Sequence, residues 1–112
     1  MRSPPWNELE NRRLARLYFD MLDNSIAGKA YVKAQMIRDA QCVDGCHQEL
    51  AGRSRASIEF KLMNATAAHL ALVPGAELTM DGFGYRAMPN YQAELKTAIS
   101  NELNERQLRA TA

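Results

Sequence analysis

The sequence contains no long apolar run, only two cysteines and almost no net charge. A helix that crosses a bilayer needs about 20 consecutive apolar residues, so we expect no membrane span. The positive charge at Arg2 has no apolar stretch behind it, which argues against a secretory signal and predicts a cytoplasmic protein. Two cysteines are also too few for the disulfide framework of a small secreted domain.

The balance of charges limits the possible partners. The chain has 14 lysines and arginines against 13 aspartates and glutamates, a formal charge of +1. Dedicated DNA-binding domains usually carry a clear basic excess. Basic residues are most frequent between positions 29 and 61, so any basic surface is expected to be local and modest.

The sequence does contain enough apolar residues for a core. At 112 residues and 46% hydrophobic, it predicts one globular domain over 1–112 with a core from about 6 to 104. Apolar residues recur at helical spacing in several stretches. These stretches are 7–22, 29–41, 46–51, 54–73 and the region from 90 onward. We therefore predict an all-α fold, a compact bundle of about five helices with a helix-turn-helix-like centre.

Turn and cap residues set the expected ends of these helices. Pro4–Pro5 stops any upstream helix, and Asn7 with Glu10 forms a capping box. Pro74–Gly75 ends the long helix, and Asn90 is the expected N-cap of the last one. The stretch between them is either a loop or a brief pair of strands. The expected buried positions are Leu14, Leu17, Tyr18, Met21, Leu22, Tyr31, Val32, Met36, Ile37, Ala40, Tyr91, Leu95, Ile99 and Leu103.

The start of the long helix has the features of a DNA-reading helix. Ser54 is a suitable N-cap, and the free N–H groups and positive dipole of a helix start favour phosphate. Arg53 and Arg55 flank this cap. A core helix with solvated ends explains the same pattern, so both interpretations stay open. Burial is expected for Ile58, Leu62, Ala65, His69 and Leu72, whereas Ser57, Lys61, Asn64 and Ala68 fall on other faces.

Glu59 is an acid within this basic helix start. Beside DNA it would repel phosphate, so we expect it to pair with Arg55 four residues earlier or to accept from a cytosine amino group. An inward structural role is the remaining alternative.

Two further patterns could hold a metal. Cys42, Cys46 and His47 suggest zinc, with His69 as a fourth ligand, but neighbouring residues on a helix point about a quarter turn apart. Buried free thiols explain the cysteines equally well. We therefore expect no metal and no cofactor.

The second pattern resembles a metal-dependent nuclease. Asp44 followed by Glu59 and Lys61 matches two carboxylates and a lysine around Mg²⁺. Residues two apart share a face on a strand but not on a helix, so a helical segment excludes this chemistry. No serine or cysteine nucleophile with a paired base can be argued either, and we expect no enzyme activity.

Aromatic residues near the glycine-rich stretch differ from those in the helices. Trp6, Tyr18 and Tyr31 lie at positions typical of a core. Tyr85, Arg86, Asn90 and Tyr91 flank a glycine-rich loop, where an arginine and two tyrosine hydroxyls could reach a phosphate or a groove.

Several blocks of the chain together resemble a known family. They are Trp6, Leu17–Leu22, Tyr31–Lys33, Gly52–Ala65 and Gly84–Gln92. Over about residues 6–99 they are similar to the N-terminal head domain of ScoMcrA-like restriction endonucleases. Those modification-dependent (type IV) enzymes join such a head to DNA-sensing modules and an HNH nuclease domain. The resemblance implies a DNA-binding accessory domain that is not catalytic by itself, because this chain ends where the nuclease would begin.

The resemblance also has limits. After Lys33 the family typically has a second basic cluster with a histidine, whereas this chain keeps only Arg38. The expected partner is double-stranded DNA. The alternatives are a protein-interaction or dimerisation module, docking for instance onto other domains of a restriction enzyme, and a small regulator from a mobile element. The expected DNA-binding residues are Arg53, Ser54, Arg55, Ser57, Lys61, Asn64, Lys33, Arg38 and Arg86.

Overall fold

The computed structural model describes residues 5–26, 33–41, 50, 52–76 and 85–111, and all regular structure within these ranges is α-helical. The helices are α1 (Glu8–Ile26), α2 (Lys33–Gln41), α3 (Arg55–Leu72) and α4 (Ala93–Thr111). The predicted all-α class is confirmed. The described residues form four helices rather than about five, and the short helix expected over 46–51 lies almost entirely outside them, as do the first four residues of the helix expected from 29.

The first helix begins with the predicted capping box. The Asn7 backbone N–H donates to Glu10 Oε1 at 2.9 Å, and the Glu10 N–H donates to Asn7 Oδ1 at 2.8 Å. The helix continues to Ile26, past the end of the stretch predicted over 7–22. Its predicted apolar positions are all buried, namely Leu14, Leu17, Tyr18, Met21 and Leu22.

The long helix α3 has the predicted ends but a wider buried surface. Ser54 is its N-cap, with the side chain accepting from the Ser57 N–H, and Val73 closes it by donating to the His69 carbonyl. Gly75 follows with φ of +89°, a conformation that glycine adopts easily. The expected stripe of Ile58, Leu62, Ala65 and His69 is buried, and so are Lys61, Asn64, Thr66 and Ala68.

That extra burial has a clear cause. Helices α1 and α4 both pack against α3, and the segment before α4 contacts α3 as well, because the Met88 N–H donates to the Met63 carbonyl at 3.1 Å. Lys61, Asn64 and Ala68, expected on faces other than the buried stripe, are therefore buried as well.

The start of α4 differs from the prediction. Asn90 has φ of +69° and lies outside the helix, which begins at Ala93. The Leu95 N–H donates to the Gln92 carbonyl at 3.1 Å, so Gln92 precedes the first helical turn. Asn90 is therefore not the N-cap. Asparagine tolerates left-handed backbone better than most residues, which explains its place in this turn.

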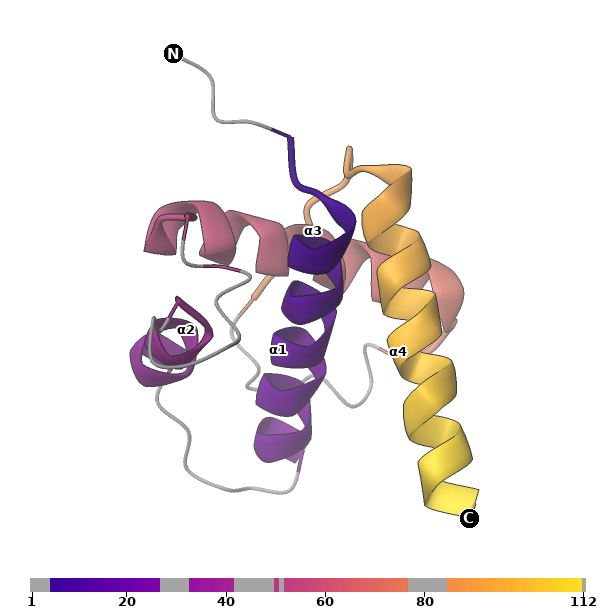
Figure 1. Cartoon of the computed structure of the whole chain (residues 1–112). Coiled ribbons are helices and arrows are strands. Elements are labelled where there is room, and N and C mark those ends of the chain that lie inside the picture. The colour runs from indigo at the N-terminus through magenta and orange to yellow at the C-terminus, as the bar shows by residue number, and fades with distance from the viewer. Residues whose placement is uncertain (1–4, 27–32, 42–49, 51, 77–84, 112) are drawn as a thin grey trace.

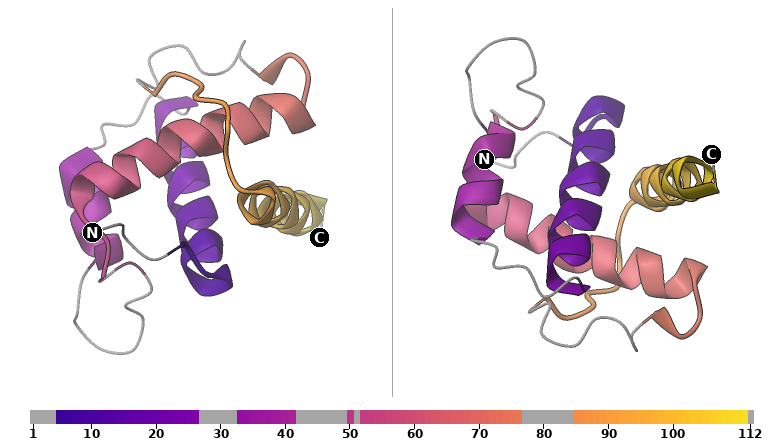
Figure 2. Two further views of the ribbon diagram at one scale, coloured as in Figure 1. Left: turned by 90° about the horizontal axis from the view of Figure 1, so that it is seen from above. Right: turned by 90° about the horizontal axis from the view of Figure 1, so that it is seen from below.

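The helices are arranged around α1. In Figure 1 and both views of Figure 2, α2 and α4 lie on opposite sides of α1, and α3 crosses the group. Leu14, Tyr18 and Met21 of α1 join Ile58 and Leu62 of α3 in one core, together with Leu95 and Ile99 of α4. Within the described residues, no helix is long and apolar enough to cross a membrane.

Candidate functional site

The first turn of α3 remains open to solvent. Ser54 and Arg55 are exposed, and the Arg55 side chain keeps 56% of its accessible surface. The end of α2 lies next to this turn, since Gln41 Nε2 donates to the Arg53 carbonyl at 2.6 Å. Arg38, in the last turn of α2, is also exposed. The two exposed arginines thus lie on neighbouring helix ends, with Arg55 in the first turn of α3 and Arg38 three residues before Gln41.

The segment before α4 lies beside the same turn. Tyr85 O–H donates to Glu59 Oε1 at 3.4 Å, and Glu59 forms an ion pair with Arg55 at 3.7 Å. The expected pairing of Glu59 with Arg55 is confirmed. Arg86, next to Tyr85, is exposed. The side chain of Lys33 lies outside the described residues.

Arg53 is not part of this exposed surface. Its side chain is 7% exposed and binds Glu10 in a bidentate manner, with Nε to Oε2 at 2.6 Å and Nη2 to Oε1 at 2.7 Å. Nη2 also donates to the Pro5 carbonyl, and the guanidinium lies 4.9 Å from the centre of the Trp6 ring. Hydrogen bonding between the two side chains lowers the pKa of Glu10 and raises that of Arg53.

Lys61 is buried in the same region. Its Nζ donates to Gln92 Oε1 at 2.8 Å and lies 5.4 Å from the Trp6 ring centre. Burial, together with the nearby charge of Arg53, lowers the pKa of Lys61. Asn64, one turn further along α3, is 4% exposed. The expectation that Arg53, Lys61 and Asn64 are exposed to a ligand is wrong, because folding encloses all three.

These contacts define the Trp6 cluster, which comprises Trp6, Glu10, Arg53, Lys61 and Gln92. It joins the starts of α1 and α3 to the residue before α4. The sequence did not indicate that Glu10 belongs to this cluster, because its place in the capping box with Asn7 already accounts for an acid at that position. Arg53 is 43 positions away from it, and no spacing rule connects residues so far apart. Three of the blocks that carry the resemblance contribute residues to this cluster, namely Trp6, Gly52–Ala65 and Gly84–Gln92. These blocks therefore have a structural role.

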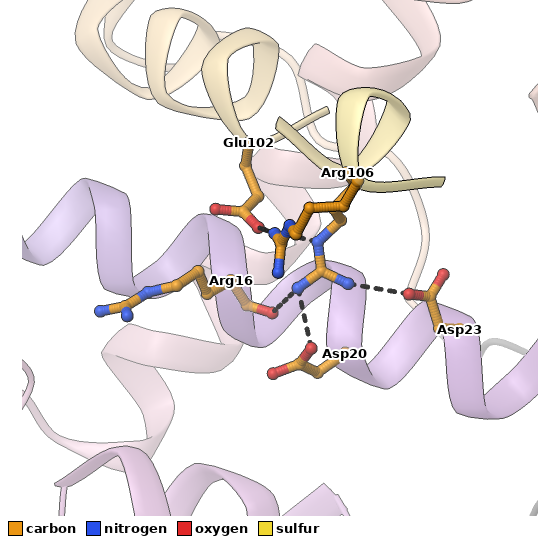
Figure 3. Close-up of polar contacts among 6 residues, drawn as sticks. Arg16, Asp20, Asp23, Glu102 and Arg106 are labelled. Carbon is orange, nitrogen blue, oxygen red and sulfur yellow. Dashed lines mark hydrogen bonds and ion pairs between the residues drawn. The ribbon is translucent and has the colours of Figure 1, made fainter. Parts of the chain in front are cut away.

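A second polar cluster fastens α4 to α1. Arg106 donates to Asp20, Asp23 and Glu102, each at 2.8 Å, and to the Arg16 carbonyl at 3.4 Å (Figure 3). Burial lowers the pKa of Arg106, but its hydrogen bonds to Asp20 and Glu102 outweigh this and raise it overall. We call Arg106 with its three carboxylates the Arg106 cluster. Sequence reasoning gave no signal for it.

His69 belongs to the core rather than to a metal site. Its Nδ1 lies 2.8 Å from the Tyr18 hydroxyl, and its ring packs edge-on against Phe19. Burial lowers the pKa of His69, so the ring is neutral at pH 7. In the described part of the chain, no group of three histidine, cysteine or acidic side chains could hold a metal.

The other nominated metal residues can be placed only in part. Cys42, Asp44, Cys46 and His47 lie outside the described residues. Glu59 contacts Arg55 and Tyr85, whereas Lys61 lies in the Trp6 cluster. A nuclease site needs these two side chains together, and the helix separates them.

We compared the chain with protein-family models, with curated proteins and with solved structures. No family model, curated protein or solved structure matches it.

Proposed function

We propose that this chain is a DNA-binding accessory domain, not catalytic by itself, which contacts the phosphate backbone through the start of α3. The observation that carries the proposal is the exposed, Ser54-capped first turn of α3 with Arg55 in it and Arg38 nearby. A helix start offers unpaired N–H groups and a positive dipole end to an anion. Arginine adds a second, bidentate phosphate ligand.

The contact set is smaller than the one expected from the sequence. Arg53, Lys61 and Asn64 are engaged or enclosed within the fold, so the proposal drops them as direct contacts. It keeps the exposed arginines together with the polar side chains of the first turn. The set is Ser54, Arg55, Ser57, Arg38 and Arg86.

Support also comes from the resemblance to restriction-enzyme head domains and from the packing of α2 beside the start of α3. In helix-turn-helix proteins the N-terminal residues of the second helix approach DNA while the first helix crosses the backbone. The modest net charge of +1 predicts weak binding that depends strongly on salt.

Fluorescence anisotropy with a labelled duplex tests the proposal. We expect binding at low salt, and removal of each phosphate contact in R38A, R55A and R86A should lower the salt slope by about 0.9. R109A is the matched control, because Arg109 is exposed at the far end of α4. Each of these variants should lose the same affinity for a methylated as for an unmethylated duplex, since a phosphate contact does not read the base.

Two results would refute this assignment. One is no binding of either duplex at low salt and micromolar protein. The other is an equal loss of affinity in R109A, which would indicate unspecific attraction to any positive charge.

A second candidate function is self-association through α3. Phe60 is 49% exposed, and Ala56, Met63 and Ala67 lie along the same helix face with partial or full exposure. A near-neutral net charge does not oppose the meeting of two copies. Sedimentation of the wild type and of F60S tests self-association. A dimer that F60S disrupts supports this function, and a wild type that is monomeric at all concentrations refutes it.

A further inference from the structure

A polar groove runs between α1 and α4. Two adjoining hollows, of about 530 and 320 Å³, share Glu8, Arg12, Ala98 and Asn101 as lining residues. Because they share these residues, they form one continuous depression, which we call the α1–α4 groove. No described residue of α3 lines it, so it is separate from the proposed DNA contact.

One buried side chain in this groove has no hydrogen-bond partner among the described residues. Asn11 lines the smaller hollow and is 1% exposed, and within the described part of the chain neither its Nδ2 nor its Oδ1 has a partner. An enclosed amide without partners costs folding free energy. A carboxamide presents one donor and one acceptor side by side. Asn11 therefore matches a ligand that presents an acceptor next to a donor, as the N–H and C=O of one residue do in an extended backbone.

The two walls of the groove differ in charge: the charged residues that line the α4 wall are all acidic, whereas the α1 wall carries two arginines together with Glu8. Arg12 and Arg16 lie one turn apart on α1, and both are exposed. Glu94 and Glu105 are exposed on the α4 wall. Phosphate groups of a nucleic acid would meet these acids. A chain with both acidic and basic side chains would find a partner on each wall.

The shape of the groove also favours a chain over a small molecule. A small-molecule site usually encloses most of its ligand. Here Glu8, Arg12 and Asn101, which line both hollows, are exposed, so a compact ligand would stay largely in water. An elongated ligand compensates by making contacts along the whole groove.

We propose that the α1–α4 groove binds a polypeptide segment of a partner protein. The backbone N–H and C=O of one residue of the segment, in extended conformation, pair with the Asn11 carboxamide. An acidic side chain of the segment binds Arg12, and a basic side chain faces Glu105. This function does not depend on DNA binding, because it uses different residues.

A peptide array provides the test. The probes are N-acetylated, C-amidated heptapeptides of alanine with one glutamate and one lysine at varied spacing, and an all-alanine heptapeptide is the reference. We expect some of the mixed-charge peptides, but not the all-alanine one, to bind the full chain at up to millimolar peptide concentration. R12A should weaken this binding about tenfold, equivalent to about 1.4 kcal/mol. R38A, on α2, is the matched control and should leave it unchanged.

Asn11 supplies a readout that does not depend on the peptide chosen. N11L should abolish peptide binding while leaving the midpoint of thermal unfolding unchanged or higher, since it removes an unpaired buried amide. A lower midpoint would show that Asn11 serves the fold and would overturn the proposal. Absence of binding by every peptide would also overturn it, as would equal losses in R12A and R38A. Displacement of a bound peptide by duplex DNA would assign the groove to nucleic acid instead.

Discussion

Two arginines fasten other elements to α1, and they do so in different surroundings. Arg53 connects the start of α3 to Glu10, and both side chains are nearly enclosed, at 7% and 10% exposure. Arg106 connects α4 to Asp20 and Asp23, which are 55% and 61% exposed. Both sites have short, well-formed hydrogen bonds. Their surroundings decide how much each site contributes to the free energy of unfolding. Solvent screens exposed charges, whereas a buried charge is strongly destabilising when its partner is removed.

A conspicuous ion-pair network is not necessarily the stronger one. In the Arg106 cluster, water can take the place of Arg106 at the exposed Asp20 and Asp23, and the enclosed Glu102 keeps Arg109 as a partner at 3.3 Å. In the Trp6 cluster, the enclosed Arg53 guanidinium has one carboxylate partner, Glu10, and water cannot readily replace it.

The largest effect is expected for R53M. The substitution keeps much of the packing volume but leaves the Glu10 carboxylate buried without its cation, which typically costs about 3–5 kcal/mol. Urea denaturation followed by circular dichroism measures the change in the free energy of unfolding. The double variant E10Q/R53M should recover part of the loss. A loss below about 1 kcal/mol for R53M would show that the site is effectively solvated.

A smaller effect is expected for E10Q, with a distinct pH dependence. Glutamine can retain the capping role, so the loss at neutral pH reflects the charged hydrogen bonds and is about 1.5–3 kcal/mol. The Arg53 guanidinium holds the pKa of Glu10 below its ordinary 4.5. The folded protein therefore binds the proton less readily than the unfolded chain, and stability falls as pH drops below about 4.5.

Denaturation curves between neutral pH and pH 3 check this sign. The wild type should lose stability more steeply with acid than E10Q, so the two curves should approach each other. Parallel curves would mean that other carboxylates account for the acid sensitivity.

R106M should destabilise the fold by about 1–2 kcal/mol, because the exposed pairs with Asp20 and Asp23 contribute roughly 0.2–1 kcal/mol each and Glu102 retains its ion pair with Arg109. The loss should shrink in high salt, where exposed charges are screened. The R53M loss should change little under the same conditions. Matched denaturation series at low and high salt measure both, and a salt-independent loss in R106M would make the two clusters equivalent.

The smallest effect is expected for R55A. Its pair with Glu59 is long, at 3.7 Å, and the Arg55 side chain is 56% exposed, so stability should change by only about 0.3–0.5 kcal/mol. Thermal melts of R55A and R53M measure this difference in stability between two arginines that are only two positions apart. A loss as large as that of R53M would show that Arg55 holds the fold and would weaken its assignment to a ligand.

Local signals in the sequence predicted most of the secondary structure. The Asn7–Glu10 box, the Ser54 cap and the Pro74–Gly75 stop each depend on a few neighbouring residues, and all three appear in the structure. The buried stripe of α1 likewise follows from helical periodicity alone. Asn90 was the exception, because α4 starts after the turn in which it lies.

The candidate site could not be read in the same way. Arg53 and Arg55 look equivalent in the sequence, yet one is enclosed against Glu10 and the other is exposed. Lys61 has the pattern of a solvated position until Trp6 and Gln92 cover it. The sequence alone determined where α1 and α3 begin and how α1 is patterned, since these depend on neighbours within a few positions. Only the tertiary structure decided which charges are enclosed, because that depends on side chains brought together from distant parts of the chain.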